Sequence, residues 1–214
     1  MVISGTAAAQ SHTGRFLALG DSYTIGEGVP ESGRWPVQLA AALRPSHKID
    51  APEIVARTGW TTDELADAMS RHTFHPPYAL VTLLIGVNNQ YRGRDLQNYR
   101  NQFRALLHRA IELADGKPQR VIVVSIPDWG ITPFAKASDR DAGQIANEID
   151  AYNAANAEIS RMLHVPYADV TAISRDRGDA PEMLVEDGLH PSAAMYRRWA
   201  KVILPTAERA LSSR

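Results

Sequence analysis

Residues 79–89 read ALVTLLIGVNN, an apolar run that ends in a glycine and two asparagines. The longest apolar stretch around it, residues 78–87, is shorter than the about 18 residues that a membrane-spanning helix requires, so residues 79–85 are expected to form a buried strand. Similar β-rich runs are Arg15 to Leu19, Glu53 to Arg57, Arg120 to Ile126 and His164 to Val170. The sequence therefore predicts five strands.

Segments of helical period separate these runs. Between residues 95 and 115, apolar side chains recur at steps of three and four, which places them on one face of a helix. Further helices are expected at residues 35–43, 62–69, 145–162 and 194–211. Thr61 followed by Glu64 is a capping box that predicts the start of the second helix. This alternation predicts an α/β fold with a parallel sheet covered by helices on both faces, in one domain over residues 14–214.

Composition excludes several classes of function. The chain has 214 residues, a formal net charge of −1 and no cysteine. A balanced charge argues against a nucleic-acid partner, because binding to phosphates needs a basic excess. The missing cysteines exclude disulfides, thiol nucleophiles and thiolate metal sites. No Gly-rich phosphate loop is present, so we expect no cofactor. His72 and His75 have a spacing that could suggest a metal pair, but Pro76 and Pro77 would break a helix that aligns them, so we expect no bound metal. We also expect no integral membrane association, and the oligomeric state is left open.

The first thirteen residues, MVISGTAAAQSHT, have neither the basic start nor the apolar stretch of a secretion signal. We expect them to be a disordered N-terminal arm. The cytoplasm is the expected compartment, with an export signal already removed by processing as the alternative.

Polar residues follow the predicted strands at the edge where ligands bind in an open α/β sheet. The segments are GDSYT at residues 20–24, TGWT at 58–61, GVNN at 86–89 and, beyond the fifth strand, DGLHP at 187–191. A serine, a histidine and an aspartate at one edge can act as a nucleophile, its general base and the group that orients the base. A glycine N–H and an amide side chain can donate hydrogen bonds to an oxyanion.

In this order GDSYT, a later glycine, GVNN and DGLHPS resemble the four sequence blocks of the SGNH hydrolases, also called the GDSL esterase/lipase family. The similarity spans about residues 15–205. It implies a flavodoxin-like, three-layer α/β/α fold with a five-stranded parallel sheet. It also implies a catalytic triad of Ser22, Asp187 and His190, and an oxyanion hole formed by Ser22, Gly59 and Asn88.

The chain departs from the family pattern at two positions. Tyr23 stands where the family name expects leucine, and Asn89 stands where aspartate is commoner, which leaves the supporting role of residue 89 open. Asp21 is expected to make a hydrogen bond that organises its loop. No GxSxG motif is present, so the nucleophile elbow of the α/β-hydrolases is excluded.

The resemblance implies a serine ester hydrolase that cleaves a small-molecule ester through an acyl-enzyme on Ser22. Short-chain or lysolipid-type carboxylic esters are the expected substrates, and O-acetylated carbohydrate is the alternative. Trp129, after the fourth strand, is a candidate substrate contact. Arg92 and Arg94 could meet an anionic head group or lie on a solvated loop. A nucleotide- or flavin-binding module is the competing class, and the absence of a phosphate loop counts against it.

Overall fold

The computed structural model describes residues 14–212. The expected N-terminal arm, residues 1–13, lies outside the described residues. Within them, five parallel strands form one sheet: β1 (Phe16–Gly20), β2 (Glu53–Ala56), β3 (Leu80–Leu84), β4 (Val121–Val124) and β5 (Tyr167–Ala168). Their order is β2-β1-β3-β4-β5, which is the flavodoxin-like order. The prediction of a five-stranded parallel sheet is confirmed.

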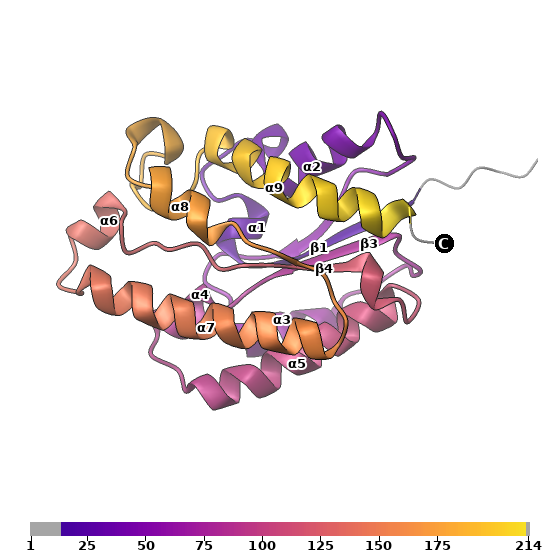
Figure 1. The fold of residues 1–214 in the computed structure, drawn as a ribbon, viewed down its shortest axis with the longest axis horizontal. Helices are drawn as coiled ribbons and strands as arrows, with labels where there is room; N and C mark the ends of the chain where they lie inside the picture. The colour runs from indigo at the N-terminus through magenta and orange to yellow at the C-terminus, as the bar shows by residue number, and fades with distance from the viewer. Residues whose placement is uncertain (1–13, 213–214) are drawn as a thin grey trace, which may run out of the picture.

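A long helix follows each strand where the sequence pattern predicts one. These helices are α2 (Trp35–Leu43), α3 (Thr62–Arg71), α5 (Leu96–Leu113), α7 (Ala142–Met162) and α9 (Ala193–Ser212). Figure 1 shows α2 and α9 on one face of the sheet and α3, α5 and α7 on the other. The three-layer α/β/α arrangement is therefore confirmed.

Several short segments lie between these elements and were not predicted. They are α1 (Ser22–Ile25), α4 (Val87–Tyr91), α6 (Pro133–Lys136), α8 (Thr171–Arg177) and 3₁₀ turns at Glu31–Gly33, Pro118–Arg120 and Pro181–Met183. Each is too short to show a helical period in sequence. Two of them, α1 and α4, directly follow strands β1 and β3 at the edge where the candidate site lies.

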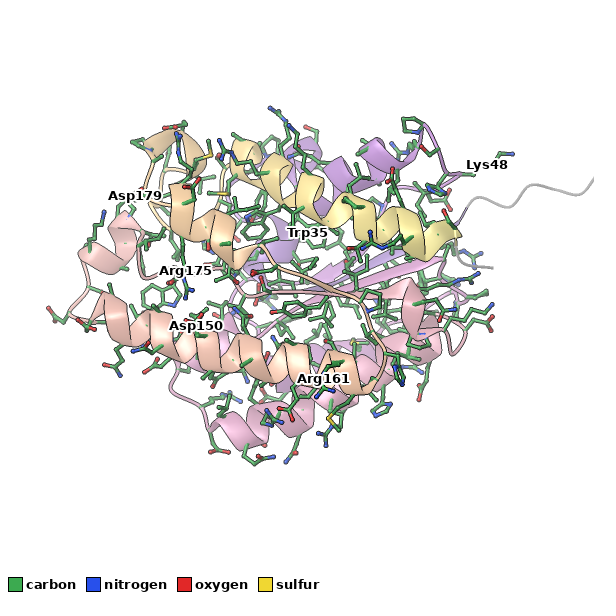
Figure 2. All side chains as sticks on the ribbon, viewed as in Figure 1. Trp35, Lys48, Asp150, Arg161, Arg175 and Asp179 are labelled. Carbon is green, nitrogen blue, oxygen red and sulfur yellow. The ribbon has the colours of Figure 1, made fainter. Side chains whose placement is uncertain are left out.

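Burial on both faces explains why the sequences of the central strands are almost entirely apolar. Every residue of β1, β3 and β4 is buried, because helices cover the sheet on both faces. Trp35 and Trp199 are fully buried on the α2 and α9 side. Trp35 is labelled in Figure 2, and its indole Nε1 donates a hydrogen bond to the backbone carbonyl of Tyr23, 3.1 Å away. This contact fixes the segment that follows β1.

The fifth strand is shorter than predicted. The sequence indicated residues 164–170, whereas β5 spans only Tyr167–Ala168. His164 has a positive φ of 57°, which ends the preceding helix, and Pro166 has no N–H for a strand partner. The Asp169 carboxylate then accepts a hydrogen bond from the Thr171 N–H at 2.8 Å and turns the chain into α8. Local turn chemistry therefore overrides the apolar pattern.

Gly86 joins β3 to α4 and lies in close packing against α5 and the segment after β4, so its replacement tests how tightly the core is packed there. Its φ is 131°, and a Cβ added there would lie 2.5 Å from the Tyr99 hydroxyl and 2.8 Å from Ile126 Cδ1. We expect Gly86→Ala to lower the free energy of unfolding by about 3 kcal/mol or more, because backbone strain and overlap add. Urea unfolding followed by circular dichroism measures this value.

Gly116 is the matched control. Its φ is 68°, and no atom lies within 4 Å of an added Cβ. Gly116→Ala therefore carries only the backbone strain, about 1–2 kcal/mol. Equal losses in the two variants would contradict the close packing around Gly86.

Candidate active site

The candidate nucleophile, Ser22, lies at the turn between β1 and α1. As the first residue of α1, Ser22 has a backbone N–H without an intrahelical partner. The turn is tight, because a Cβ at Gly20 would overlap the Thr24 hydroxyl and the Leu84 carbonyl oxygen. Ser22 is 4% exposed and lines a pocket at the strand ends. The sequence of β1 and its turn therefore fixes the position of the hydroxyl.

Asp21 organises this turn, as predicted. Its carboxyl Oδ1 accepts a hydrogen bond from the Tyr23 N–H at 3.0 Å, and its Oδ2 is buried with no hydrogen-bond partner. Burial raises the pKa of Asp21 to about 7, although the Tyr23 N–H opposes this shift. The group is fully buried and is not among the residues that line the pocket.

Asp187 and His190 form a hydrogen-bonded pair. The imidazole Nδ1 lies 2.6 Å from Asp187 Oδ2, and the other carboxylate oxygen accepts from the backbone N–H groups of Leu189 and His190 at 2.8 and 2.9 Å. Burial acts to raise the pKa of Asp187, but these hydrogen bonds lower it below its ordinary value. The carboxylate is thus ionised at neutral pH, and it orients the imidazole with Nε2 left free.

His190 and Ser22 line the same pocket, but no hydrogen bond joins their side chains among the described residues. In a free enzyme such a bond is often long and forms only when substrate binds. The ring of Tyr23 packs against the imidazole, with ring centroids 5.7 Å apart. Tyr23, which stands where the family name expects leucine, therefore packs against the imidazole of His190.

Gly59 and Asn88, the other predicted oxyanion donors, also line this pocket. Gly59 has a φ of 87° within the turn that the Trp60 N–H closes on the Arg57 carbonyl at 3.3 Å. Asn88 Nδ2 donates to the Trp60 carbonyl at 2.9 Å. Because an amide nitrogen carries two hydrogens, one remains for a ligand. Ser22, Gly59 and Asn88 are thus brought to one site from three strand ends.

The role of Asn89, which the sequence left open, is structural. It is fully buried, its Oδ1 accepts from the Thr62 N–H at 3.1 Å, and its Nδ2 donates to the Thr62 hydroxyl at 2.7 Å. Asparagine has both the acceptor and the donor that this pairing needs, whereas an ionised aspartate would have only acceptors. Asn89 therefore attaches α4 to the start of α3.

The pocket has a volume of about 220 Å³. Its lining residues come from five segments: Ser22, Tyr23, Thr58, Gly59, Val87, Asn88, Tyr91, Trp129, Phe134, Leu189 and His190. This volume is below the about 300–1,000 Å³ of typical small-molecule pockets. Trp129, the predicted substrate contact, forms its wall together with Tyr91 and Phe134, whose rings lie 5.4 and 6.1 Å from it.

A polar network holds this wall. Trp129 Nε1 donates to Gln90 Oε1 at 2.9 Å, and Gln90 Nε2 donates to Glu148 at 2.6 Å. Arg140 donates to the same carboxylate at 3.0 Å, with its guanidinium 5.2 Å from the Trp129 ring centroid. This network could not be predicted from the sequence, because its members lie far apart in the chain.

The two arginines that flank Gly93 are paired. Arg92 contacts Glu64 at 3.4 Å, and Arg94 contacts Asp63 at 2.8 Å, so both reach the acidic start of α3. They are partly exposed, as expected for the solvated-loop interpretation. Neither is the unpaired cation that an anionic head group would favour.

The described residues form a three-layer α/β/α fold with a pocket at the strand ends, and sequence comparison specifies the family. The model of the GDSL-like Lipase/Acylhydrolase family matches residues 18–198. The chain belongs to this family, which makes it a carboxylic ester hydrolase and confirms the resemblance found in its sequence blocks. No sequence among curated proteins matches the chain.

Solved structures share the fold at low sequence identity. TesA is 20% identical, with a TM-score of 0.66 over 92% of this chain and 99% of TesA. The lipase/acylhydrolase from Enterococcus faecalis is 17% identical, with a TM-score of 0.67 over 91% and 95% of the two chains. A catalytic mutant of Axe2, an acetylxylan esterase from Geobacillus stearothermophilus, is 19% identical, with a TM-score of 0.68 over 94% and 97%.

Two features are absent from residues 14–212. No helix in this range is long and apolar enough to cross a membrane. The same range contains no group of three or more histidine, aspartate or glutamate side chains placed to hold a metal ion.

The buried carboxyl of Asp21 generates a pH prediction. Its pKa is 3.8 as the ordinary value and about 7 in the fold, so between these values the folded state holds a proton that the unfolded state has released. The contribution of Asp21 to the stability of the wild type therefore falls as pH rises through this window, by about 4 kcal/mol in total at about 1.4 kcal/mol per pH unit. Asp21→Asn keeps the acceptor for Tyr23 and does not titrate.

Urea unfolding of both proteins at several pH values checks this. The free energy of unfolding of Asp21→Asn minus that of the wild type is expected to increase from about pH 4 to about pH 7. A difference that stays constant with pH would show that Asp21 keeps an ordinary pKa.

Proposed function

We propose that the chain hydrolyses short-chain carboxylic esters through an acyl-enzyme on Ser22, within one catalytic domain formed by residues 14–214. The observation that carries the proposal is the Asp187–His190 pair, joined at 2.6 Å, in the same pocket as Ser22. Family membership supports ester hydrolysis as the reaction. The competing nucleotide- or flavin-binding function has no comparable support, because the strand ends carry a serine and a histidine in place of a phosphate loop.

In the first step the Ser22 hydroxyl oxygen attacks the ester carbonyl carbon, and its proton passes to His190 Nε2. Asp187 holds Nδ1–H of the imidazole and stabilises the imidazolium that forms. The carbonyl oxygen becomes an oxyanion. The N–H groups of Ser22 and Gly59 and the free amide hydrogen of Asn88 would donate to it.

The tetrahedral intermediate then collapses. The bond between the carbonyl carbon and the alcohol oxygen breaks, and the imidazolium of His190 gives its proton to the departing alcohol. Water repeats the attack on the acyl-enzyme, with His190 again taking the proton. The carboxylic acid leaves, and the Ser22 hydroxyl recovers its proton.

The size of the pocket favours a short acyl group. Its volume is about 220 Å³, and Trp129, which is 2% exposed, forms part of its wall. Because the Gln90–Glu148–Arg140 network holds the Trp129 ring, this wall resists displacement by a longer chain. The pocket therefore favours a short-chain ester over a lysolipid as the substrate.

Replacing Ser22 tests the proposed function. Ser22→Ala should lower kcat by about 10⁴ to 10⁶-fold, because the nucleophile is lost. Asn88→Ala should lower kcat by about 10² to 10³-fold, because one oxyanion donor is lost. Initial rates with 4-nitrophenyl acetate measure both, and a fluorophosphonate probe should label the wild type at Ser22. Retention of the wild-type rate by Ser22→Ala would refute the acyl-enzyme.

A carbohydrate acetate is a second candidate substrate, and the rim of the pocket favours it. Tyr91 and Phe134 are 50% and 38% exposed, and both line the pocket. Thr58 and Asn88 add polar groups to the same lining. An aromatic face beside polar groups suits a sugar ring, which has both C–H faces and hydroxyl groups.

Truncating both rim aromatics distinguishes the two candidates. If a sugar stacks there, Tyr91→Ala with Phe134→Ala should lower kcat/KM for an acetylated pyranoside by at least about 10-fold. The kcat/KM for glyceryl triacetate, which has no ring, should stay within about two-fold. Met162 is 54% exposed and outside the pocket, so Met162→Ala is the control. Equal losses for both esters would argue against the sugar.

A further inference from the structure

Arg92 contacts the oxyanion loop, residues 57–61, directly. Its guanidinium Nη2 donates a hydrogen bond to the Gly59 carbonyl oxygen at 2.6 Å. Its Nη1 lies 3.4 Å from Glu64 Oε2, and the same carboxylate oxygen accepts from the Thr61 N–H at 2.9 Å. Arg92 therefore bonds Gly59 directly and is linked through Glu64 to Thr61, where the loop enters α3.

The loop needs such an attachment. Gly59 has a φ of 87°, and as a glycine it can adopt other backbone conformations at little cost. The Trp60 N–H closes the turn on Arg57 at 3.3 Å, near the limit of a hydrogen bond. A charge-assisted bond to the Gly59 carbonyl is stronger than a neutral one. It holds the Gly59–Trp60 peptide, which directly follows the Thr58–Gly59 peptide that carries the Gly59 N–H, and so limits the rotation of Gly59 between the two.

The attachment also relates two oxyanion donors to each other. Arg92 is the residue that ends α4, the helix that carries Asn88. Asn88 holds the Trp60 carbonyl at 2.9 Å, while Arg92 holds the adjacent Gly59 carbonyl at 2.6 Å. The hydrogen bonds from Asn88 and Arg92 to neighbouring carbonyls thus attach the loop that carries the Gly59 N–H to the helix end that carries the Asn88 amide.

We propose that Arg92 is a positioning residue for the oxyanion hole. Arg92 keeps the Gly59 N–H in a fixed position relative to the Asn88 amide, so that both can donate to the same oxyanion. This inference rests on the proposed function. Arg92 does not contact the reacting atoms in this account. It acts through Gly59, and its loss would let the donor move away from the place where the oxyanion forms.

Arg94 provides a matched control. It also pairs with an acidic residue at the start of α3, Asp63 at 2.8 Å, and its side chain is similarly exposed, at 31% against 41% for Arg92. The difference is that no hydrogen bond of the Arg94 side chain reaches Gly59 among the described residues. Any effect of losing a surface ion pair should therefore be common to both arginines.

The experiment compares Arg92→Ala, Arg92→Lys and Arg94→Ala with 4-nitrophenyl acetate. We expect Arg92→Ala to lower kcat by about 10 to 100-fold with KM within about two-fold of the wild type, because a transition-state interaction is weakened. Arg92→Lys, which keeps a cationic donor, should fall between Arg92→Ala and the wild type. Arg94→Ala should keep kcat within about two-fold.

Inhibition by an alkylboronic acid gives a readout that loss of stability would not move. The boronate forms a tetrahedral anion on a serine and resembles the intermediate, so its Ki should rise in Arg92→Ala by about the factor by which kcat/KM falls. Thermal unfolding shows whether each variant is folded. If Arg92→Ala does not fold, Arg92→Lys is decisive, with a lower kcat, a higher Ki and an unchanged KM expected.

An unchanged kcat in the folded Arg92 variants, an equal loss in Arg94→Ala, or an effect on KM alone would overturn the role of Arg92. Failure of the proposed function gives a different result, because Ser22→Ala would then keep its activity. Loss of activity in Ser22→Ala with full activity in Arg92→Ala rejects only the positioning role.

Discussion

The parallel pairing of β1 with β3 is the constraint on which the candidate site depends. Gly20 at the end of β1 is aligned with Leu84 at the end of β3, so both strands finish at the same level. The chain then turns at once into α1 and α4, which carry Ser22 and Asn88. A shift of this register would separate the nucleophile from the amide donor, whatever the rest of the chain did.

The remaining parts reach the site by local turns of different kinds. Gly59 follows β2 in a turn that a positive φ allows, and Asp187 closes the turn that presents His190. The Asp187 carboxylate thus has two functions, since one oxygen holds backbone N–H groups and the other holds the imidazole.

Much of this could be predicted from the sequence, because the informative patterns are local. The five apolar runs, the helix at residues 96–113 and the Thr61–Glu64 capping box depend on neighbours in the chain. Periodicity does not say which strands pair, so the strand order was indicated only by the family resemblance, which implies a flavodoxin-like fold. The length of β5 was overestimated, since turn residues at His164 and Pro166 interrupt the apolar pattern.

Contacts between residues far apart in the chain could not be predicted, because local sequence patterns do not say which distant side chains meet. Gln90, Glu148 and Arg140 hold the Trp129 wall from separate elements, and Arg92 holds Gly59 across 33 positions of the chain. In sequence each is an ordinary polar residue of a helix or a loop. Their roles follow only from the way that α4 meets the loop after β2 and the start of α7.

Trapping of the covalent intermediate shows whether Ser22 is the residue that is acylated. The enzyme is mixed with excess 4-nitrophenyl acetate, quenched in acid during turnover, digested and examined by mass spectrometry. With Ser22 as the nucleophile, we expect one added acetyl group on the peptide that contains Ser22, at the serine itself. An acetyl group on another residue, or turnover without any acylated peptide under conditions where acyl transfer outruns hydrolysis, would contradict it.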